Sequence, residues 1–290
     1  MKMKQLVITV LSGFINVTAV LFPKWNAEYL FDLLCKVKRV GISEKGRIFL
    51  EKGQTQYLDI DGFSAALHKW GSGDKNLLFL HGWMSNSQRW APYVEQLDLN
   101  EYTVYALDAP GHGMARGNRL NLEVYRKAMV QSIDLIGEVE TLVCHSLGSL
   151  VGSYGYLHNE KIAINRFIIM GAPSGVDAIF IYFKDLVGLS KKAMQNLEVK
   201  INEVLQLPHN EIGIAQFIEK VERPVLVVHE RTDRITPFEP IRVASEWASN
   251  GSPHPKRNQK QIATFFTEGQ DHNLKSTETV DRVLQFINNR

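Results

Sequence analysis

Residues 141–149 read TLVCHSLGS, and this segment is the most informative about the fold. Its first four residues carry no charge, and His145 and Ser146 follow them at once. A continuous apolar run, in contrast to an alternating one, predicts a strand that is buried on both faces, as in a parallel sheet. The stretch therefore places His145 and Ser146 at the carboxyl end of a buried strand, where open α/β sheets bind their ligands.

Five further apolar runs have the same character, at residues 77–80, 103–107, 167–170, 225–228 and 262–266. The intervals between them leave room for crossover helices, such as one over residues 122–136. This alternation predicts an α/β fold, with a mostly parallel central sheet flanked by helices. More alternating segments at residues 48–50 and 65–70 predict an antiparallel edge, and residues 249–260 predict a loop.

The interval between residues 170 and 225 is the longest, and it includes a helical stretch at residues 184–205. We interpret residues 174–220 as a helical cap inserted over the carboxyl edge of the sheet. The core then comprises residues 46–173 and 221–290. Residues 1–45 form an N-terminal helical extension.

The composition excludes several classes of protein. The chain has 290 residues, of which 44% are hydrophobic and 22% charged, so collagen-like, low-complexity and wholly disordered chains are ruled out. A net charge of +2 leaves too little basic excess for binding nucleic acid. The two cysteines, Cys35 and Cys144, form neither a disulfide framework nor a zinc motif, which favours a cytoplasmic location.

The amino terminus is less decisive. Lys2 and Lys4 precede residues 5–23, which carry no charge, as in signal peptides and short anchors. Mildly polar residues nevertheless recur every three or four positions and form one stripe on a helix: Gln5, Thr9, Ser12 and Asn16. We therefore expect an uncleaved helix packed on the protein. Peripheral contact with a membrane and a cleaved signal peptide remain the alternatives.

Each remaining motif follows a predicted strand, and together they resemble the α/β-hydrolase superfamily from about residue 60 to the end of the chain. The segment Cys144-His145-Ser146-Leu147-Gly148 is similar to the nucleophile elbow, G-x-S-x-G, with cysteine in place of the first glycine. His81-Gly82-Trp83 follows an earlier strand. Asp233 and His272 follow the last two predicted strands, in the order expected for this fold.

The resemblance implies that Ser146 is the nucleophile, His272 the general base and Asp233 the acid that orients the histidine. Glu230 and Asp271 are the competing acids. The backbone N–H groups of Trp83 and Leu147 would form the oxyanion hole.

Substrate contacts are expected from Trp83, from His145 because it lies beside the nucleophile, and from Phe180 and Phe183 of the insertion, which would line an apolar acyl pocket. Packing of the cap onto the core is the other role open to Phe180 and Phe183. His81 and His112 are expected to hold their turns by hydrogen bonds to the backbone.

These features predict a serine hydrolase that cleaves a small carboxylic ester or thioester through an acyl-enzyme on Ser146. An acyltransferase or a C–C bond hydrolase could use the same three residues. A binding protein of the same fold without catalysis is the alternative from another class. The sequence implies no metal or organic cofactor, and it predicts no oligomeric state.

Overall fold

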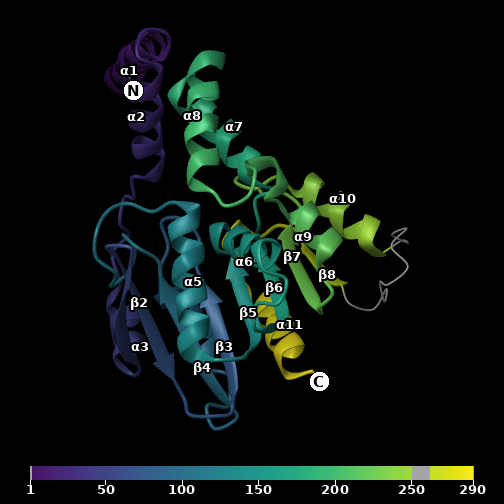
Figure 1. Cartoon of the computed structure of the whole chain (residues 1–290). Coiled ribbons are helices and arrows are strands. Elements are labelled where there is room, and N and C mark those ends of the chain that lie inside the picture. The colour runs from purple at the N-terminus through teal and green to yellow at the C-terminus, as the bar shows by residue number, and fades with distance from the viewer. Residues whose placement is uncertain (1, 250–261, 290) are drawn as a thin grey trace.

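A computed structural model describes residues 2–249 and 262–289, so the loop expected at residues 249–260 lies almost wholly outside the described residues (Figure 1). Its centre is an eight-stranded sheet in the order β1-β2-β4-β3-β5-β6-β7-β8. Strand β2 is antiparallel to both β1 and β4, and the remaining pairs are parallel. The strands are β1 (Gln54–Ile60), β2 (Phe63–Trp70), β3 (Lys75–Leu80), β4 (Tyr102–Asp108), β5 (Val139–His145), β6 (Ile164–Met170), β7 (Val225–Glu230) and β8 (Ile262–Thr267).

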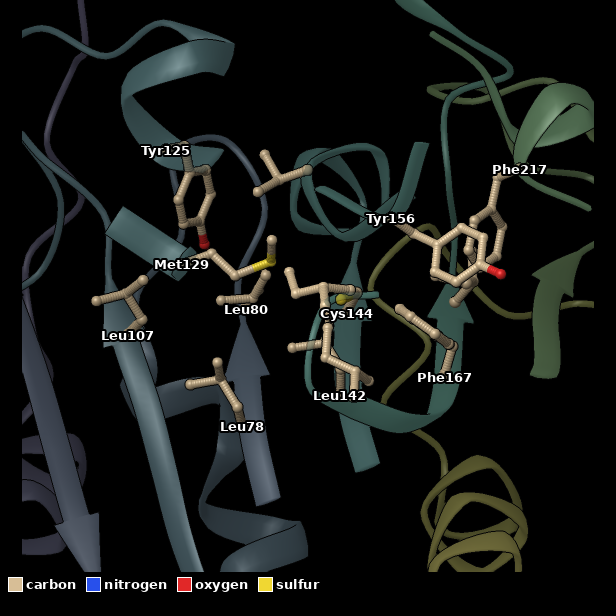
Figure 2. Close-up of a cluster of buried hydrophobic side chains, with 14 of the residues drawn as sticks. Leu78, Leu80, Leu107, Tyr125, Met129, Leu142, Cys144, Tyr156, Phe167 and Phe217 are labelled. Atoms are coloured by element: carbon tan, nitrogen blue, oxygen red, sulfur yellow. The ribbon is translucent and has the colours of Figure 1, made fainter. Parts of the chain in front are cut away.

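Helices cover both faces of the sheet, because alternate side chains of each buried strand enter different apolar clusters. Leu78 and Leu80 of β3 belong to the cluster that packs against α5 (Leu122–Ile136), α6 (Leu147–His158), α9 (Ile214–Lys220) and α10 (Phe238–Ser249), part of which Figure 2 shows. Leu77 and Phe79 belong to the opposite cluster, with α3 (Glu44–Glu51), the 3-10 helix η1 (Ser87–Trp90), α4 (Ala91–Val94) and α11 (Thr277–Asn288). The predicted α/β fold is confirmed.

One edge element was predicted wrongly. Residues 48–50 belong to helix α3, and the antiparallel edge strand is β1 instead. Ser43 caps α3 by accepting a hydrogen bond from the Gly46 N–H, and Glu44 occupies its first turn. In a short helix only one face is buried, here through Phe49 and Leu50, so its apolar residues imitate a strand in the sequence.

A third apolar cluster joins the N-terminal extension to the segment after β6. Helices α1 (Lys2–Leu21) and α2 (Pro23–Cys35) pack against α7 (Val176–Val187) and α8 (Lys191–Val204), through residues such as Ile15, Leu30 and Leu197. The expected helical stretch is interrupted at Gly188, which has a left-handed conformation with φ of 75°. Of residues 174–220, α7 and α8 lie in this cluster, whereas α9 packs on the sheet, and η2 (His209–Glu211) connects them.

Figure 1 shows α1, α2, α7 and α8 gathered at the end of the molecule beyond the carboxyl ends of the parallel strands. Within the described residues, no helix has both the length and the apolar character required to cross a membrane.

Candidate active site

Ser146 lies in a sharp turn between β5 and α6. Its backbone has φ of 53° and ψ of −121°, a conformation that a residue with a side chain rarely adopts. A hydrogen bond of 2.8 Å from its N–H to the carbonyl oxygen of Met170 holds the turn. The helix leaves so close to β3 that a Cβ on Gly148 would lie 2.4 Å from the Leu80 carbonyl oxygen, so glycine is required there.

Cys144 replaces the first glycine of the elbow pattern. Space for its side chain is provided by Gly152, which lies in α6, the helix that follows the elbow. The side chain is fully buried, and a Cβ on Gly152 would lie 2.9 Å from its Sγ. The glycine at position 152 thus leaves the space that the cysteine occupies. Burial raises the pKa of the Cys144 thiol well above its ordinary value, so the residue acts as a small apolar group.

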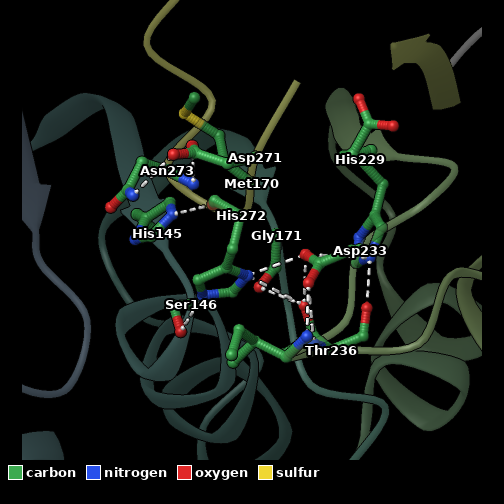
Figure 3. A network of polar contacts seen from close by, with 12 residues as sticks. His145, Ser146, Met170, Gly171, His229, Asp233, Thr236, Asp271, His272 and Asn273 are labelled. Atoms are coloured by element: carbon green, nitrogen blue, oxygen red, sulfur yellow. Dashed lines mark hydrogen bonds and ion pairs between the residues drawn. The ribbon is translucent and has the colours of Figure 1, made fainter. Parts of the chain in front are cut away.

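The structure brings Ser146, His272 and Asp233 together in one hydrogen-bonded chain (Figure 3). Nε2 of His272 lies 2.9 Å from Oγ of Ser146, and Nδ1 lies 2.7 Å from Oδ2 of Asp233. A carboxylate accepts only, so the Nδ1–H of His272 donates to Asp233. Nε2 is then free to accept the hydroxyl proton of Ser146.

Asp233 is held ionised by the turn in which it lies. Its Oδ1 accepts the N–H groups of Ile235 and Thr236, and its Oδ2 accepts the hydroxyl of Thr236 as well as the imidazole. Burial alone would raise the pKa of Asp233, but the hydrogen bonds from His272, Thr236 and Ile235 outweigh it and lower the pKa to about 2.

The two competing acids have other partners. The buried carboxylate of Glu230 accepts five hydrogen bonds, from the N–H and hydroxyl of Thr232, the hydroxyl of Thr267, and the N–H groups of Gly269 and Gln270. It therefore joins the loop after β7 to the loop that carries His272. Asp271 is exposed, and among the described residues its carboxylate accepts hydrogen bonds only from Asn273.

The segment after β3 lies directly over the serine. A Cβ on Gly82 would be 2.7 Å from the Cβ of Ser146, so the next N–H, that of Trp83, is in the neighbourhood of the serine hydroxyl. Leu147 is the first residue of α6, where N–H groups have no partner within the helix. These two N–H groups are the hydrogen-bond donors that were predicted to form the oxyanion hole.

His81 and His112 hold this segment in place. The ring of His81 contacts the carbonyl oxygen of Gly82 through Nδ1 and accepts the Ala109 N–H at Nε2, while Nε2 of His112 accepts the Met84 N–H. Burial is the main reason that the pKa of His81 falls to about 3, so this ring is neutral. The backbone-holding role predicted for both histidines matches these contacts.

Comparison with known sequences identifies the family, because residues 77–272 match the profile of the Alpha/beta hydrolase family. The chain belongs to the α/β-hydrolase family.

Two curated relatives align with part of this hydrolase. The chain is 31% identical over 101 residues to the dihydrolipoyllysine-residue acetyltransferase component of the acetoin cleaving system of Cupriavidus necator, covering 34% of this chain and 27% of that protein. It is 31% identical over 94 residues to the pimeloyl-[acyl-carrier protein] methyl ester esterase of Klebsiella pneumoniae, covering 32% of this chain and 35% of that protein. The alignments thus span about a third of the relatives' length.

Among solved structures, a bromoperoxidase from Bacillus anthracis has a TM-score of 0.58 at 16% identity. The superposition covers 81% of this chain and 99% of the other. At this identity the likeness supports the fold alone.

In this hydrolase a buried arginine, which the sequence motifs did not single out, contacts the loop of His272. Arg89 donates from Nη1 to Nδ1 of His145 and from Nη2 to the carbonyl oxygen of Asn273, at 2.5 and 2.9 Å. His145 in turn contacts the carbonyl oxygen of His272 through Nε2, at 2.8 Å. Arg89 lies in no recognisable motif, so only the structure reveals its role.

A cleft of about 750 Å³ opens beside Ser146. Residues from the segments 40–49, 83–95 and 272–275 line it, together with His145 and Ser146. No residue of the segment 174–220 does so among those described.

The expectation that Phe180 and Phe183 contact substrate is therefore corrected. Both are buried in the third apolar cluster, which also contains residues of α1, α2 and α8. They take the other role left open by the sequence, which is packing. The apolar side chains that line the cleft come instead from α3, the segment leading to it and residues 83–92, including Ile48, Phe49 and Trp83. No group of three or more His, Cys, Asp or Glu side chains suited to a metal ion occurs in the described ranges.

Proposed function

We propose that the protein is a serine hydrolase that cleaves a carboxylic ester or thioester through an acyl-enzyme on Ser146. The proposal rests on two hydrogen bonds of the His272 imidazole. Nε2 lies 2.9 Å from Oγ of Ser146, and Nδ1 lies 2.7 Å from Oδ2 of Asp233. A serine hydroxyl needs a base within hydrogen-bond reach to become a nucleophile at neutral pH. His272 meets that distance requirement, and Asp233 fixes its tautomer.

In the first half of the reaction, Oγ of Ser146 bonds to the substrate carbonyl carbon while its proton passes to Nε2 of His272. The carbonyl electron pair moves to oxygen, and the N–H groups of Trp83 and Leu147 stabilise the resulting oxyanion. The oxyanion then collapses, and the bond to the alcohol or thiol breaks. His272 returns its proton to this leaving group.

In the second half, water attacks the acyl-enzyme and gives a proton to His272. Collapse of the second oxyanion releases the carboxylic acid, and His272 returns the proton to Oγ of Ser146. Asp233 remains ionised throughout, in keeping with its lowered pKa, and stabilises the imidazolium formed in each half.

The surroundings of Ser146 support an ester of modest size. The cleft includes apolar side chains such as Ile48, Phe49 and Trp83, which suit an acyl chain. A curated relative that the chain partly matches is an ester hydrolase by name.

Turnover of nitrophenyl esters and thioesters of increasing acyl length tests this function. We expect Ser146→Ala to lower kcat by about 10⁴- to 10⁶-fold with unchanged folding. Purified Ser146→Ala that retains a tenth of wild-type turnover would refute the mechanism. A wild-type protein that hydrolyses none of these compounds would refute the ester and thioester assignment.

A further inference from the structure

Helix α1 is apolar on two faces, but the structure covers only one of them. Ile15 and Ala19 are fully buried in the third apolar cluster. On the remaining surface of α1, large apolar side chains are more than half exposed: Val10, Phe14, Val17, Val20 and Leu21. A contiguous exposed apolar face marks a site of interaction, so we expect a second surface to cover this face of α1.

The exposed apolar face continues onto α2, and α7, which contacts α1, also exposes large apolar side chains. Phe22 is 60% and Trp25 48% exposed, and the Trp25 ring contacts that of Phe14 edge to face at 5.9 Å. At the end of α7, the side chains of Ser12 and Asn16 both donate to the carbonyl oxygen of Gly188, which ties α7 to α1. Helix α7 itself exposes Ile181, Tyr182 and Leu186. We call these residues of α1, α2 and α7 the apolar pole.

The N-terminal segment that contains α1 and α2 has a positive net charge. Residues 1–40 contain six lysines and arginines against two acidic residues, whereas the rest of the chain contains 27 against 29. Both acidic residues of this segment are ion-paired with other parts of the chain, Glu28 with Lys200 and Asp32 with Arg119. Lys24 is exposed between Phe22 and Trp25 and forms no ion pair with any described residue.

We propose that the apolar pole docks this protein onto the surface of a bilayer that contains anionic lipids. Exposed aliphatic and aromatic side chains flanked by lysine match the chemistry of that interface, where apolar groups enter the acyl boundary and lysine meets lipid phosphate. Trp25 stacks on Tyr29 at 5.1 Å, and amphipathic rings of this kind are enriched at membrane interfaces. Figure 1 shows α1 and α2 projecting from the body of the molecule, so the pole is free to meet an extended surface.

Vesicle flotation with the full chain tests the proposal. One set of vesicles is phosphatidylcholine alone, and the other contains phosphatidylglycerol as well. We expect binding to the anionic vesicles that weakens with added salt and is weaker on the neutral ones. The double variants Phe14→Ser/Trp25→Ser and Val17→Ser/Val20→Ser should each bind at least about tenfold less.

A control variant and measurements of folding separate loss of the apolar pole from general damage to the protein. The matched control Tyr57→Ser/Leu135→Ser removes side chains that are 52% and 54% exposed on β1 and α5, and it should bind as the wild type does. Circular dichroism and ester turnover in solution report folding of every variant, and the Val17 and Val20 pair spares the ring contact between α1 and α2.

Either of two results would overturn the proposal. One is a wild-type chain that floats with neither kind of vesicle, or folded variants that float like the wild type. The other is a stable dimer in sedimentation that both apolar-pole variants dissociate, because the pole would then join two copies of the chain.

Discussion

Arg89 donates a hydrogen bond from Nη1 to Nδ1 of His145 across 2.5 Å, and both side chains are buried. Since Nδ1 accepts, the ring proton of a neutral His145 lies on Nε2, which donates to the carbonyl oxygen of His272. Burial, and then the Arg89 cation, lower the pKa of His145 well below its ordinary value, so the ring stays neutral. The pair thereby fixes the backbone that carries His272.

Arg89→Met removes both donors and leaves Nδ1 of His145 and the Asn273 carbonyl oxygen without a partner. A misplacement of reacting groups by about 1 Å costs about 100-fold, so we expect kcat to fall by about 10- to 100-fold, with KM nearly unchanged. Steady-state kinetics measures this split.

Arg166→Met is the matched control, because Arg166 also donates to carbonyl oxygens, those of Phe286 and Ile287 in α11. It should lower the melting temperature and leave kcat intact. Equal kinetic losses in the two variants would mean that Arg89 supports the fold in general and has no special effect on His272.

Asp233→Asn should lower kcat by at least about 10³-fold, because an amide favours the wrong imidazole tautomer. Asp271→Asn changes the exposed carboxylate of the residue that directly precedes His272. It should lower kcat by less than about tenfold, which is under about 1.4 kcal/mol of activation barrier. Both are measured as kcat on one ester. An active Asp233→Asn would remove Asp233 from the mechanism.

Glu230→Gln should reduce stability mainly above pH 4.5. Burial alone raises the pKa of Glu230, but hydrogen bonds from Thr232, Thr267 and Gln270 lower it from 4.5 to about 2. A lowered folded-state pKa gives stability that is complete above the unfolded pKa and is lost as the pH falls through the folded one.

Thermal melting as a function of pH therefore checks the role of Glu230. The difference in melting temperature between wild type and Glu230→Gln should be largest near neutral pH and shrink as the pH falls from 4.5 toward 2. A difference that stays constant over this range would mean that the charge of Glu230 does not hold the two loops.

Gly152→Ala should destabilise the protein by about 1–3 kcal/mol, as overpacking of a core does. The new methyl group would meet Sγ of Cys144 at 2.9 Å. In a Cys144→Ala background that contact is absent, so the cost of Gly152→Ala should fall by at least about 0.5 kcal/mol. Denaturant unfolding of the four proteins gives the coupling, and a coupling of zero would disprove the compensation between these positions.

The sequence predicts the buried strands well because both faces of a central strand are apolar, which gives short uninterrupted runs such as residues 77–80 and 225–228, each followed by polar residues and glycine or proline. It places Ser146, Asp233 and His272 at strand ends, and the structure brings them together. It fails at residues 48–50, where one buried face of a short helix imitates a strand.

Long-range partners are the other failure. Phe180 and Phe183 are apolar whichever way their helix faces, so their packing against α1 and α8 depends on an N-terminal extension far away in the chain. The contacts of Arg89 likewise join residues 56 and 184 positions apart, which no local pattern encodes. Glu230 could be distinguished from Asp233 only when the partners of each carboxylate were known.

Mapping of a covalent adduct shows whether Ser146 is the nucleophile. The wild-type protein is treated with a fluorophosphonate, digested, and examined by peptide mass spectrometry, with Ser146→Ala in parallel. We expect one phosphonyl group per chain, on Ser146, and none on the variant. A wild-type protein that stays unlabelled, or one labelled on another residue with equal labelling of Ser146→Ala, would contradict it.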